Sequence, residues 1–433
     1  MKSHLRPVLA VAGFLVVYVL AATAQQVNMT IDSLSVDQAV QIALENHPSL
    51  KAASAGVDAA GAGLTQAKST YYPAIIGTAT AQHTDGAFVF NPNVPITTQT
   101  YNNYTAGVSV QQTLIDFGKQ FGRVSGNSKL FDAASSDYQS AVAVVIENAR
   151  VAYFGLVQAK QIAAVDLEAL QRAQDHLKQA QAYYAVGVRA QFDVTKAEVD
   201  VANAQVNEIH SRNQLVVAKI TLDNAMGIRT KSMYKVANDF EVEPFTMSLD
   251  SVKEVTFAVL PELQAAKARV DANSAFASAA WQQNMPTLSA FGSANWSSFG
   301  FPLYGRWNAG ITLTLPIFEG FLIQGQVDQA RANEEEAQAN YRDLTETVLL
   351  AVQQAYLTVK EADERITASA KLVEQADQNL TLADKQYAAG VGSAIEVADA
   401  QLSLSNARIT HIQALYDYNT SLTRLRRAMG ILK

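Results

Sequence analysis

The same pattern of residues occurs twice in this chain of 433 residues. Tyr184 begins a segment that contains Tyr-Ala-x-Gly-Val, and Tyr387 begins a matching segment 203 positions later. At the same offset, Leu222-x-x-Ala-Met-Gly-Ile recurs as Leu425-x-x-Ala-Met-Gly-Ile. Self-similarity at a fixed spacing over most of a chain indicates that one structural unit has been duplicated.

The boundaries of the two units follow from how the offset changes along the chain. Near the start of each half the offset is 213, as between Pro48 and Pro261, so the first unit contains a longer loop than the second. The repeat predicts a first unit at residues 34–227 and a second at residues 251–430. We expect residues 228–250 to form an irregular linker between them.

Each unit is expected to be mainly helical. Proline, which interrupts helices, is absent between Pro95 and Pro244 and again after Pro316. These regions predict long antiparallel helices at residues 119–226 and 322–429, each broken by a glycine-containing turn. At about 1.5 Å per residue, the longer member of each pair would extend roughly 95 Å, so the predicted molecule is elongated. A proline opens two further predicted helices, at residues 48–70 and 261–283.

Between these helices, each unit alternates strictly between apolar and small polar residues. The alternation predicts β-hairpins at residues 73–115 and 286–317, the first with a longer loop around residues 85–100. Only Asp85 is charged between Ser69 and Ile115. Strands of about ten residues with one apolar and one uncharged polar face are typical of membrane β-barrels. The alternative, a sheet packed on a soluble core, explains the alternation but not the shortage of Lys and Glu.

Four strands are too few to close a barrel. Hydrocarbon does not tolerate an open sheet edge, because the backbone groups there would be unpaired, so the chain is expected to oligomerise. Closure alone allows both two and three copies. Amphipathic rings favour the headgroup level of a membrane. We therefore predict an aromatic girdle, formed by Tyr104, Trp296, Tyr304 and Trp307.

The first residues indicate export from the cytoplasm. Lys2 and Arg6 precede an uncharged apolar run, and Ala22-Thr23-Ala24 has the small-x-small pattern of a signal-peptidase site. Residues 1–24 are therefore predicted to be a signal peptide. The alternative is an uncleaved anchor, although the run is shorter than the roughly 20 residues of a membrane span. We expect no transmembrane helix after it.

Composition excludes some classes of protein. The chain has no cysteine, so no disulfide and no lipid-bearing cysteine is possible. Its formal net charge of -7 argues against nucleic acid as a partner. The six histidines have no metal-ligand spacing, and no phosphate loop or nucleophile motif is present. We expect neither enzymatic activity nor a cofactor.

A family resemblance follows from the order of these features together with the motifs between them. Asp116-Phe-Gly and Glu319-Gly precede the long helices, and Tyr-x-x-Gly-Val precedes each return helix. In this arrangement the chain resembles the TolC outer-membrane efflux proteins over nearly all of its mature length. The resemblance implies a mixed α/β, mainly α, membrane protein. Its strands would join a trimeric, twelve-stranded transmembrane β-barrel, and its helices would form a periplasmic α-barrel.

The same resemblance implies a function and partners. Such a homotrimer would be the passive exit duct of a tripartite efflux or type I secretion system in the outer membrane. Outer-membrane lipid, a periplasmic adaptor and an inner-membrane pump would be its partners. The alternative from another class is a periplasmic coiled-coil scaffold or adhesin stalk without channel activity. The residues do not distinguish drug, metal and protein substrates.

The glycine-containing turns are the candidate functional sites. The resemblance implies that they contact the adaptor through Val186, Gly187, Val188, Arg189, Ala389, Gly390 and Val391. The alternative is that these are ordinary loop residues. Family members have an arginine in the second turn, where this chain has Gly392. A closing link through that arginine cannot be transferred to this chain, and Arg189 is the candidate substitute.

Acidic residues next to these turns are the candidate gate. Glu396 and Asp399 are three positions apart and share one face at the start of the last helix. Similar channels have acids at matching positions that line the periplasmic mouth, where rings of carboxylates favour cations. In the first repeat Asp193 matches Glu396, but Lys196 stands in place of Asp399. Stabilisation of the helix N-terminus is the alternative role for these acids.

Overall fold

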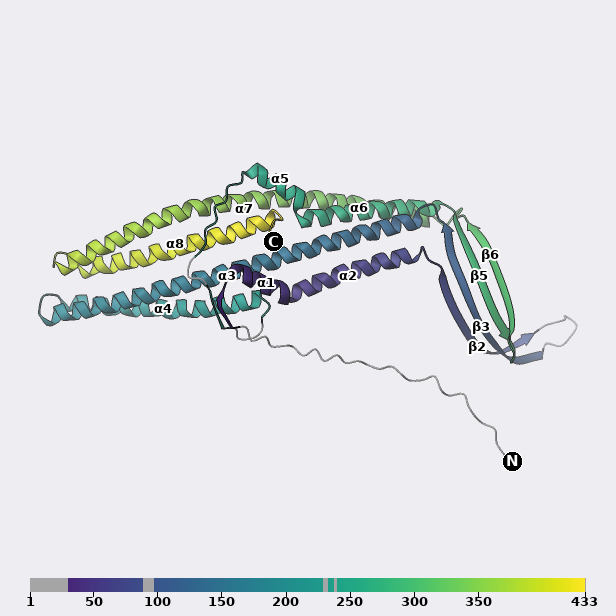
Figure 1. Cartoon of the computed structure of the whole chain (residues 1–433), viewed down its shortest axis with the longest axis horizontal. Coiled ribbons are helices and arrows are strands. Elements are labelled where there is room, and N and C mark those ends of the chain that lie inside the picture. The colour runs from purple at the N-terminus through teal and green to yellow at the C-terminus, as the bar shows by residue number, and fades with distance from the viewer. Residues whose placement is uncertain (1–29, 89–96, 229–232, 237–239, 433) are drawn as a thin grey trace, which may run out of the picture.

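The computed structural model describes residues 30–88, 97–228, 233–236 and 240–432. The predicted signal peptide, residues 1–24, lies outside the described residues. The chain forms an elongated rod, with a β-sheet at one end and two long helical hairpins that reach the other (Figure 1). Both halves have the same order of elements, which is two short or medium helices, two strands, a long helix and a return helix.

The long helices have the length that the proline-free regions predict. α3 (Lys119–Ala185) and α7 (Leu322–Ala388) each contain 67 residues. The return helices α4 (Gln191–Ala225) and α8 (Ala394–Ala428) each contain 35. Corresponding helices begin and end at the offset of 203 positions that relates the two sequence repeats. The α3–α4 hairpin and the α7–α8 hairpin are therefore two copies of one antiparallel unit.

Side chains satisfy the free backbone N–H groups where two of these helices begin. The carboxylate of Asp116 accepts hydrogen bonds from the backbone N–H of Gly118 (3.2 Å) and of Gln120 (2.8 Å) at the start of α3. At the start of α8, Ser393 and Glu396 form a capping box. A helix leaves its first amides without intrahelical partners, so these contacts stabilise the point at which each helix starts.

Shorter elements lie beside the long helices, from the middle of the rod to the sheet (Figure 1). They are α1 (Val36–Asn46), α2 (Pro48–Ser69), α5 (Leu249–Val259), α6 (Pro261–Trp281), the 3-10 turn Gln282–Asn284, and the strands β1 (Thr30–Leu34) and β4 (Met233–Val236). α2 packs along α3, and α6 packs against both α3 and α7. β1 and β4 pair in parallel. The prediction that residues 228–250 are irregular is therefore wrong for β4, which was missed because a four-residue strand has too little periodicity to be recognised.

One antiparallel sheet contains β2 (Ala74–Phe88), β3 (Thr97–Ile115), β5 (Thr287–Ser298) and β6 (Tyr304–Thr314), in that order. The two predicted β-hairpins are thus joined by pairing of β3 with β5. The described residues of the loop predicted around 85–100 are strand, because pairing continues through Asp85–Thr100 to Phe88–Thr97. Residues 89–96 lie outside the described residues.

The register confirms that the sheet has one apolar face. Val108 lies opposite Gly77 on β2 and Ala294 on β5, and Ala294 in turn lies opposite Trp307 on β6. Alternate residues of a strand point to the same side, so the predicted apolar residues share one face. That face is open to the surroundings, since Trp307 is 82% exposed and Ile311 67% exposed. The alternative of a sheet packed on a soluble core is therefore wrong.

Three of the four predicted girdle residues share this apolar face. Trp296 on β5 pairs with Ala106 on β3, and Tyr104 lies two positions from Ala106 on β3, so both aromatic residues are on the side of Ala106. Tyr304 instead pairs with Ser297, which places it with the opposite, polar face. A one-residue change of position reverses the direction of a strand side chain, so the aromatic content of a segment does not by itself assign a face.

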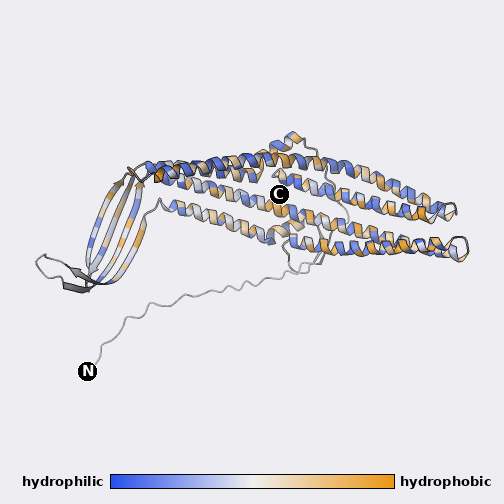
Figure 2. Ribbon diagram, turned by 180° about the vertical axis from the view of Figure 1, so that it is seen from behind, coloured by the Kyte–Doolittle hydropathy of each residue, from blue (hydrophilic) through white to orange (hydrophobic). Residues whose placement is uncertain are grey.

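The helices bury small clusters along their length in place of one globular core. One cluster joins α1, α3, α4 and β4 around Tyr153 and Leu222, and another joins α5, α7 and α8 around Val352 and Tyr418. Figure 2 shows hydrophobic residues spread along all the long helices. The helices of the first cluster belong to the first repeat and those of the second cluster to the second repeat, so each helical hairpin has a hydrophobic cluster of its own.

α3 is the most apolar of the long helices. Within the described part of the chain, it alone has an 18-residue window apolar enough to cross a membrane. However, 44% of that window is buried inside the protein, and α3 packs against α2, α4, α6 and α8. Its composition is therefore that of the central helix of the bundle.

The close contact of α3 with α6 leads to a prediction. A Cβ atom at Gly122 would lie 2.8 Å from the Cβ of Ala279 and 3.1 Å from the carbonyl oxygen of Ala275. Gly122→Ala should therefore force the helices apart and destabilise the protein by about 1–3 kcal/mol, measured by thermal unfolding in detergent. The matched control is Gly155→Ala on the same helix, where the nearest atom is 3.9 Å away and stability should not fall. Equal stability of the two variants would contradict this account of the contact.

Candidate functional site

The turns at the far end of the two hairpins have nearly the same backbone. Gly187 and Gly390 have φ values of 76° and 82°, a left-handed conformation that favours glycine at the end of a helix. The N–H of Val188 donates to the carbonyl oxygen of Tyr183 (2.9 Å), and the N–H of Val391 donates to that of Gln386 (3.1 Å). Both turns therefore reverse the chain by the same hydrogen-bonding pattern, as the repeat predicts.

Apolar side chains point outward from these turns. Val186 is 72% exposed, Val188 65% and Val391 82%. Exposed valines at the tip of a hairpin are costly in water unless another surface covers them. The geometry is therefore compatible with the predicted contact role, although the contact itself stays a prediction.

Arg189 joins the two turns. Its Nη2 donates to the carbonyl oxygens of Gly392 (3.0 Å) and Tyr387 (3.3 Å), and its guanidinium lies 4.7 Å from the centre of the Tyr387 ring. Planar guanidinium groups stack on aromatic rings and donate in several directions, which suits this position. The acceptors are backbone carbonyls at the end of α7 and in its turn, so the contact does not require a carboxylate. The second turn therefore has no arginine, because Gly392 stands at that position, and the arginine of the first turn, Arg189, donates to it instead.

The three predicted gate acids come from different hairpins. Asp193 is half-buried at the start of α4, whereas Glu396 and Asp399 are exposed at the start of α8. Glu396 accepts a hydrogen bond from the backbone N–H of Ser393 (2.8 Å), and the Ser393 hydroxyl accepts one from the N–H of Glu396 (3.2 Å). The helix-capping role is therefore real for Glu396. Its exposure leaves a role at the pore mouth as a prediction, as it does for Asp399.

Tyr387 is the central residue of this site, and sequence reasoning used it only as part of a motif. Its side chain is 1% exposed and contacts the rings of His176 on α3 and Tyr183. Burial raises the pKa of its phenol, with Asp193 acting in the same direction and Arg189 against it. Its copy in the first repeat, Tyr184, is 47% exposed. The repeat could therefore identify the motif but not which tyrosine lies between the hairpins.

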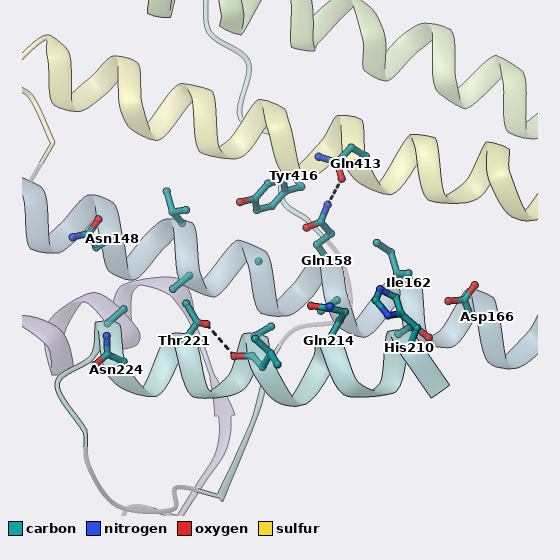
Figure 3. A pocket seen from close by; sticks show the side chains of 18 of the residues that line it. Asn148, Gln158, Ile162, Asp166, His210, Gln214, Thr221, Asn224, Gln413 and Tyr416 are labelled. Carbon is teal, nitrogen blue, oxygen red and sulfur yellow. Dashed lines mark hydrogen bonds between the residues drawn. The ribbon is translucent and has the colours of Figure 1, made fainter. Parts of the chain in front are cut away.

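Polar contacts also join the two hairpins away from the tip. A groove of about 690 Å³ lies between α3, α4 and α8, and amide side chains, Asp166 and Tyr416 line it (Figure 3). Gln158 on α3 donates to Gln413 on α8 across it. Farther along, Arg408 of α8 pairs with Glu168 of α3 at 2.8 Å. We call the contact between the two hairpins, from Gln158 to the Arg189–Tyr387 pair, the hairpin interface. Side chains cross it at Gln158, at Glu168 and at Arg189.

Loss of the Arg189 contact should loosen the tips. The chain has no cysteine, so Val186→Cys and Val391→Cys provide unique positions for spin labels. Adding Arg189→Ala should broaden the distance distribution between the labels, because hydrogen bonds from a charged donor in a partly exposed site contribute on the order of 1 kcal/mol. The control is Arg212→Ala, since Arg212 pairs only along α4 with Glu208. Identical distributions for both variants would show that Arg189 does not join the tips.

Comparison with known proteins agrees with this arrangement. The family model described as outer membrane efflux protein matches residues 39–228 and 258–431. Outer membrane protein TolC of Escherichia coli is 22% identical over 91% of this chain and 82% of that protein. The alkaline protease secretion protein AprF of Pseudomonas aeruginosa is 25% identical over 77% of this chain and 70% of its own length. The Campylobacter jejuni CmeC outer membrane channel has the same fold, with a TM-score of 0.81 at 20% identity over 91% of this chain and 85% of that one. The chain is a member of the outer membrane efflux protein family.

Proposed function

We propose that three copies of this chain form one passive duct across the outer membrane and the periplasm, through which an inner-membrane pump exports its substrate. The observation that carries the proposal is a sheet with one apolar face and two open edges, joined end to end to helices of 67 residues. A sheet of this kind suits lipid on one side and water on the other. The long helices suit a wall that extends beyond the membrane.

The free edges of the sheet support the assembly of several copies into one barrel. β2 and β6 are the edge strands of the sheet, and each pairs with a neighbour on one side only. In a membrane their free backbone groups need partners, which β6 of one copy and β2 of the next would supply. Three copies would then give twelve strands. We take the number three from the family rather than from the geometry of one chain.

Apolar residues on the outer helices support the same assembly. α4 and α7 lie at opposite edges of the row of helices α4-α3-α8-α7 that contacts within the chain define. Both carry large side chains that are half or more exposed. On α4 these are Val206, Val216 and Ile220, and on α7 they are Leu350, Leu357 and Leu382. Packing α4 of one copy against α7 of the next would remove this apolar surface from water.

The tips are the proposed docking surface for the adaptor and the pump. They lie at the end of the rod farthest from the sheet (Figure 1), and their exposed valines offer an apolar contact. A secretion protein and TolC are among the relatives, which supports an export role. The duct itself would then be passive, and its energy would come from the pump.

The acids at the tips are the proposed gate. Three copies would place Glu396 and Asp399 in rings around the mouth, and negative rings attract cations. Glu396 would have two roles, because its carboxylate also caps α8. Glutamine serves as well as glutamate in a capping box, so a charge-neutral substitution can separate the two roles.

Cation selectivity tests the gate. The double variant Glu396→Gln and Asp399→Asn should retain the helix cap and lower the preference for cations in planar bilayers, because the rings lose their charge. The measurement is the reversal potential in a salt gradient. Asp250 on α5, far from the tips, supplies the control Asp250→Asn. A reversal potential equal to that of the unmodified channel would remove the lining role.

Oligomeric state tests the duct. Leu357 on α7 is 63% exposed in one copy, and Leu357→Arg should weaken the trimer because it would place a charge in the proposed contact. The mass in detergent, measured by light scattering, should fall toward that of one chain. Asp363→Arg, at an exposed polar position about 120° around the same helix from Leu357, is the control and should leave the mass unchanged. An intact trimer in Leu357→Arg would rule out this packing of α7.

A further inference from the structure

We propose that His176 makes the hairpin interface sensitive to acid, so that protonation of its ring separates the two tips and widens the periplasmic mouth. The effect on the mouth rests on the proposed function. The separation of the tips is a property of one chain and can be measured without it.

The position of His176 is the first part of the argument. It lies on α3, nine residues before that helix ends at the tip, and only 7% of its surface is exposed. Its ring centre is 5.0 Å from that of Tyr387 on α7, so it packs across the interface between the hairpins. Nε2 is buried and has no hydrogen-bond partner. The site therefore accommodates a neutral ring and offers no acceptor at this nitrogen for an added proton.

Charged and titratable groups surround the ring on three elements. Asp193, Lys196 and Asp200 face it from α4, and Asp384 and Tyr387 from α7. Two groups of α3 take part as well: the ring of Tyr183 contacts that of Tyr387, and Arg172 acts to lower the pKa of Asp384. Arg189 lies over Tyr387 from the tip. Lys196 pairs with Asp200 at 2.5 Å, which reduces what that carboxylate can offer to His176.

The balance of these groups favours the neutral imidazole. Burial lowers the pKa of His176 below its ordinary value of 6.5; Asp384, Asp200 and Asp193 act to raise it, and Lys196 acts to lower it. Because the pKa is lower in the joined arrangement than in water, that arrangement has its full stability above pH 6.5 and loses it as the pH falls below that value. Separation of the hairpins would expose the ring and relieve the cost.

The contact with Tyr387 explains why protonation would act on the tip. The Tyr387 ring contacts both His176 and the guanidinium of Arg189. Protonation of His176 would place a second cation against a ring that already has one, in a buried site where like charges repel strongly. Arg189 also holds the backbone carbonyls of Tyr387 and Gly392. Displacement of Tyr387 would therefore release the only contact that joins the two described turns through a side-chain donor.

Asp384 acts in the opposite sense. Burial raises its pKa above 3.8, while His176 and Arg172 act to lower it. Its protonation at low pH favours the joined arrangement, because the neutral carboxyl is the form that burial prefers. Asp384→Asn removes this opposing step, and it also removes an acid that raises the pKa of His176. In that variant the separation of the tips at low pH should therefore be larger, because the joined arrangement binds the His176 proton less well.

The experiment measures the distance between the tips as a function of pH. Spin labels at Val186→Cys and Val391→Cys report it in the full chain, from about pH 7.5 to about pH 5, the range in which histidine titrates. The population at long distance should rise at least about threefold, with a midpoint below 6.5. His176→Phe keeps an aromatic ring against Tyr387 but cannot titrate, so this rise should disappear.

The matched control is His411→Phe. Burial also lowers the pKa of His411, but its ring contacts Ser369 of the same α7–α8 hairpin at 3.0 Å and does not cross the interface. This variant should keep the pH response. If His176→Phe keeps it too, or if the unmodified protein shows none, the inference is wrong.

Conductance separates this inference from the proposed function. In bilayers the unmodified channel should conduct more as periplasmic pH falls, and His176→Phe should conduct equally at all pH values in the range. Absence of any current in either protein would contradict the duct and leave the distance measurement to decide the role of His176. A normal current with the same pH dependence in His176→Phe would contradict the inference and leave the duct intact.

Discussion

The structure depends on one constraint, which is that the backbone groups at the edge of a sheet need hydrogen-bond partners inside a membrane. The sheet of one chain has two free edges, β2 and β6, and an apolar face that no other part of the described chain covers. Such a sheet is incomplete alone. The rest of the molecule has the same character, since it forms a thin row of helices whose outer members expose leucine and valine. Assembly with further copies would pair the free backbone groups of the sheet edges and cover the apolar side chains of the outer helices.

Small residues make this thin architecture possible within one chain. Gly122 allows α3 to approach α6, and alanines occupy many of the buried positions along both long helices. Close approach of two helices buries area without large side chains, which suits a wall that is one helix thick. The low aromatic content of the helical segments, which looks unlike that of a globular domain, is thus a consequence of the shape.

Much of this fold could be predicted, because its signals are local and occur twice. Proline-free regions and glycine turns located the long helices to within about three residues, and the alternation in the strands gave the correct faces. The pairing of β1 with β4 could not be foreseen, since neither strand is long enough to have a recognisable period. Arg189 was identified as a candidate from its position in a turn, but its acceptors are backbone carbonyls, which no sequence pattern marks. His176 appeared as one of six scattered histidines, because its neighbour Tyr387 lies more than 200 positions away.

The duplicated halves differ at several positions where they meet. The equivalents of Arg189, Lys196 and His176 in the second repeat are Gly392, Asp399 and Asn379, whereas the turns themselves are nearly superimposable in their hydrogen bonding. The two turns therefore share their backbone, whereas these three interface side chains occur in the first repeat alone. A hydrophobic interface would have tied the hairpins into one body, because its separation would expose apolar area to water. Amide hydrogen bonds, ion pairs and the buried rings of His176 and Tyr387 cross this interface, and water can replace the hydrogen bonds if the hairpins separate, so each hairpin would keep its own hydrophobic cluster.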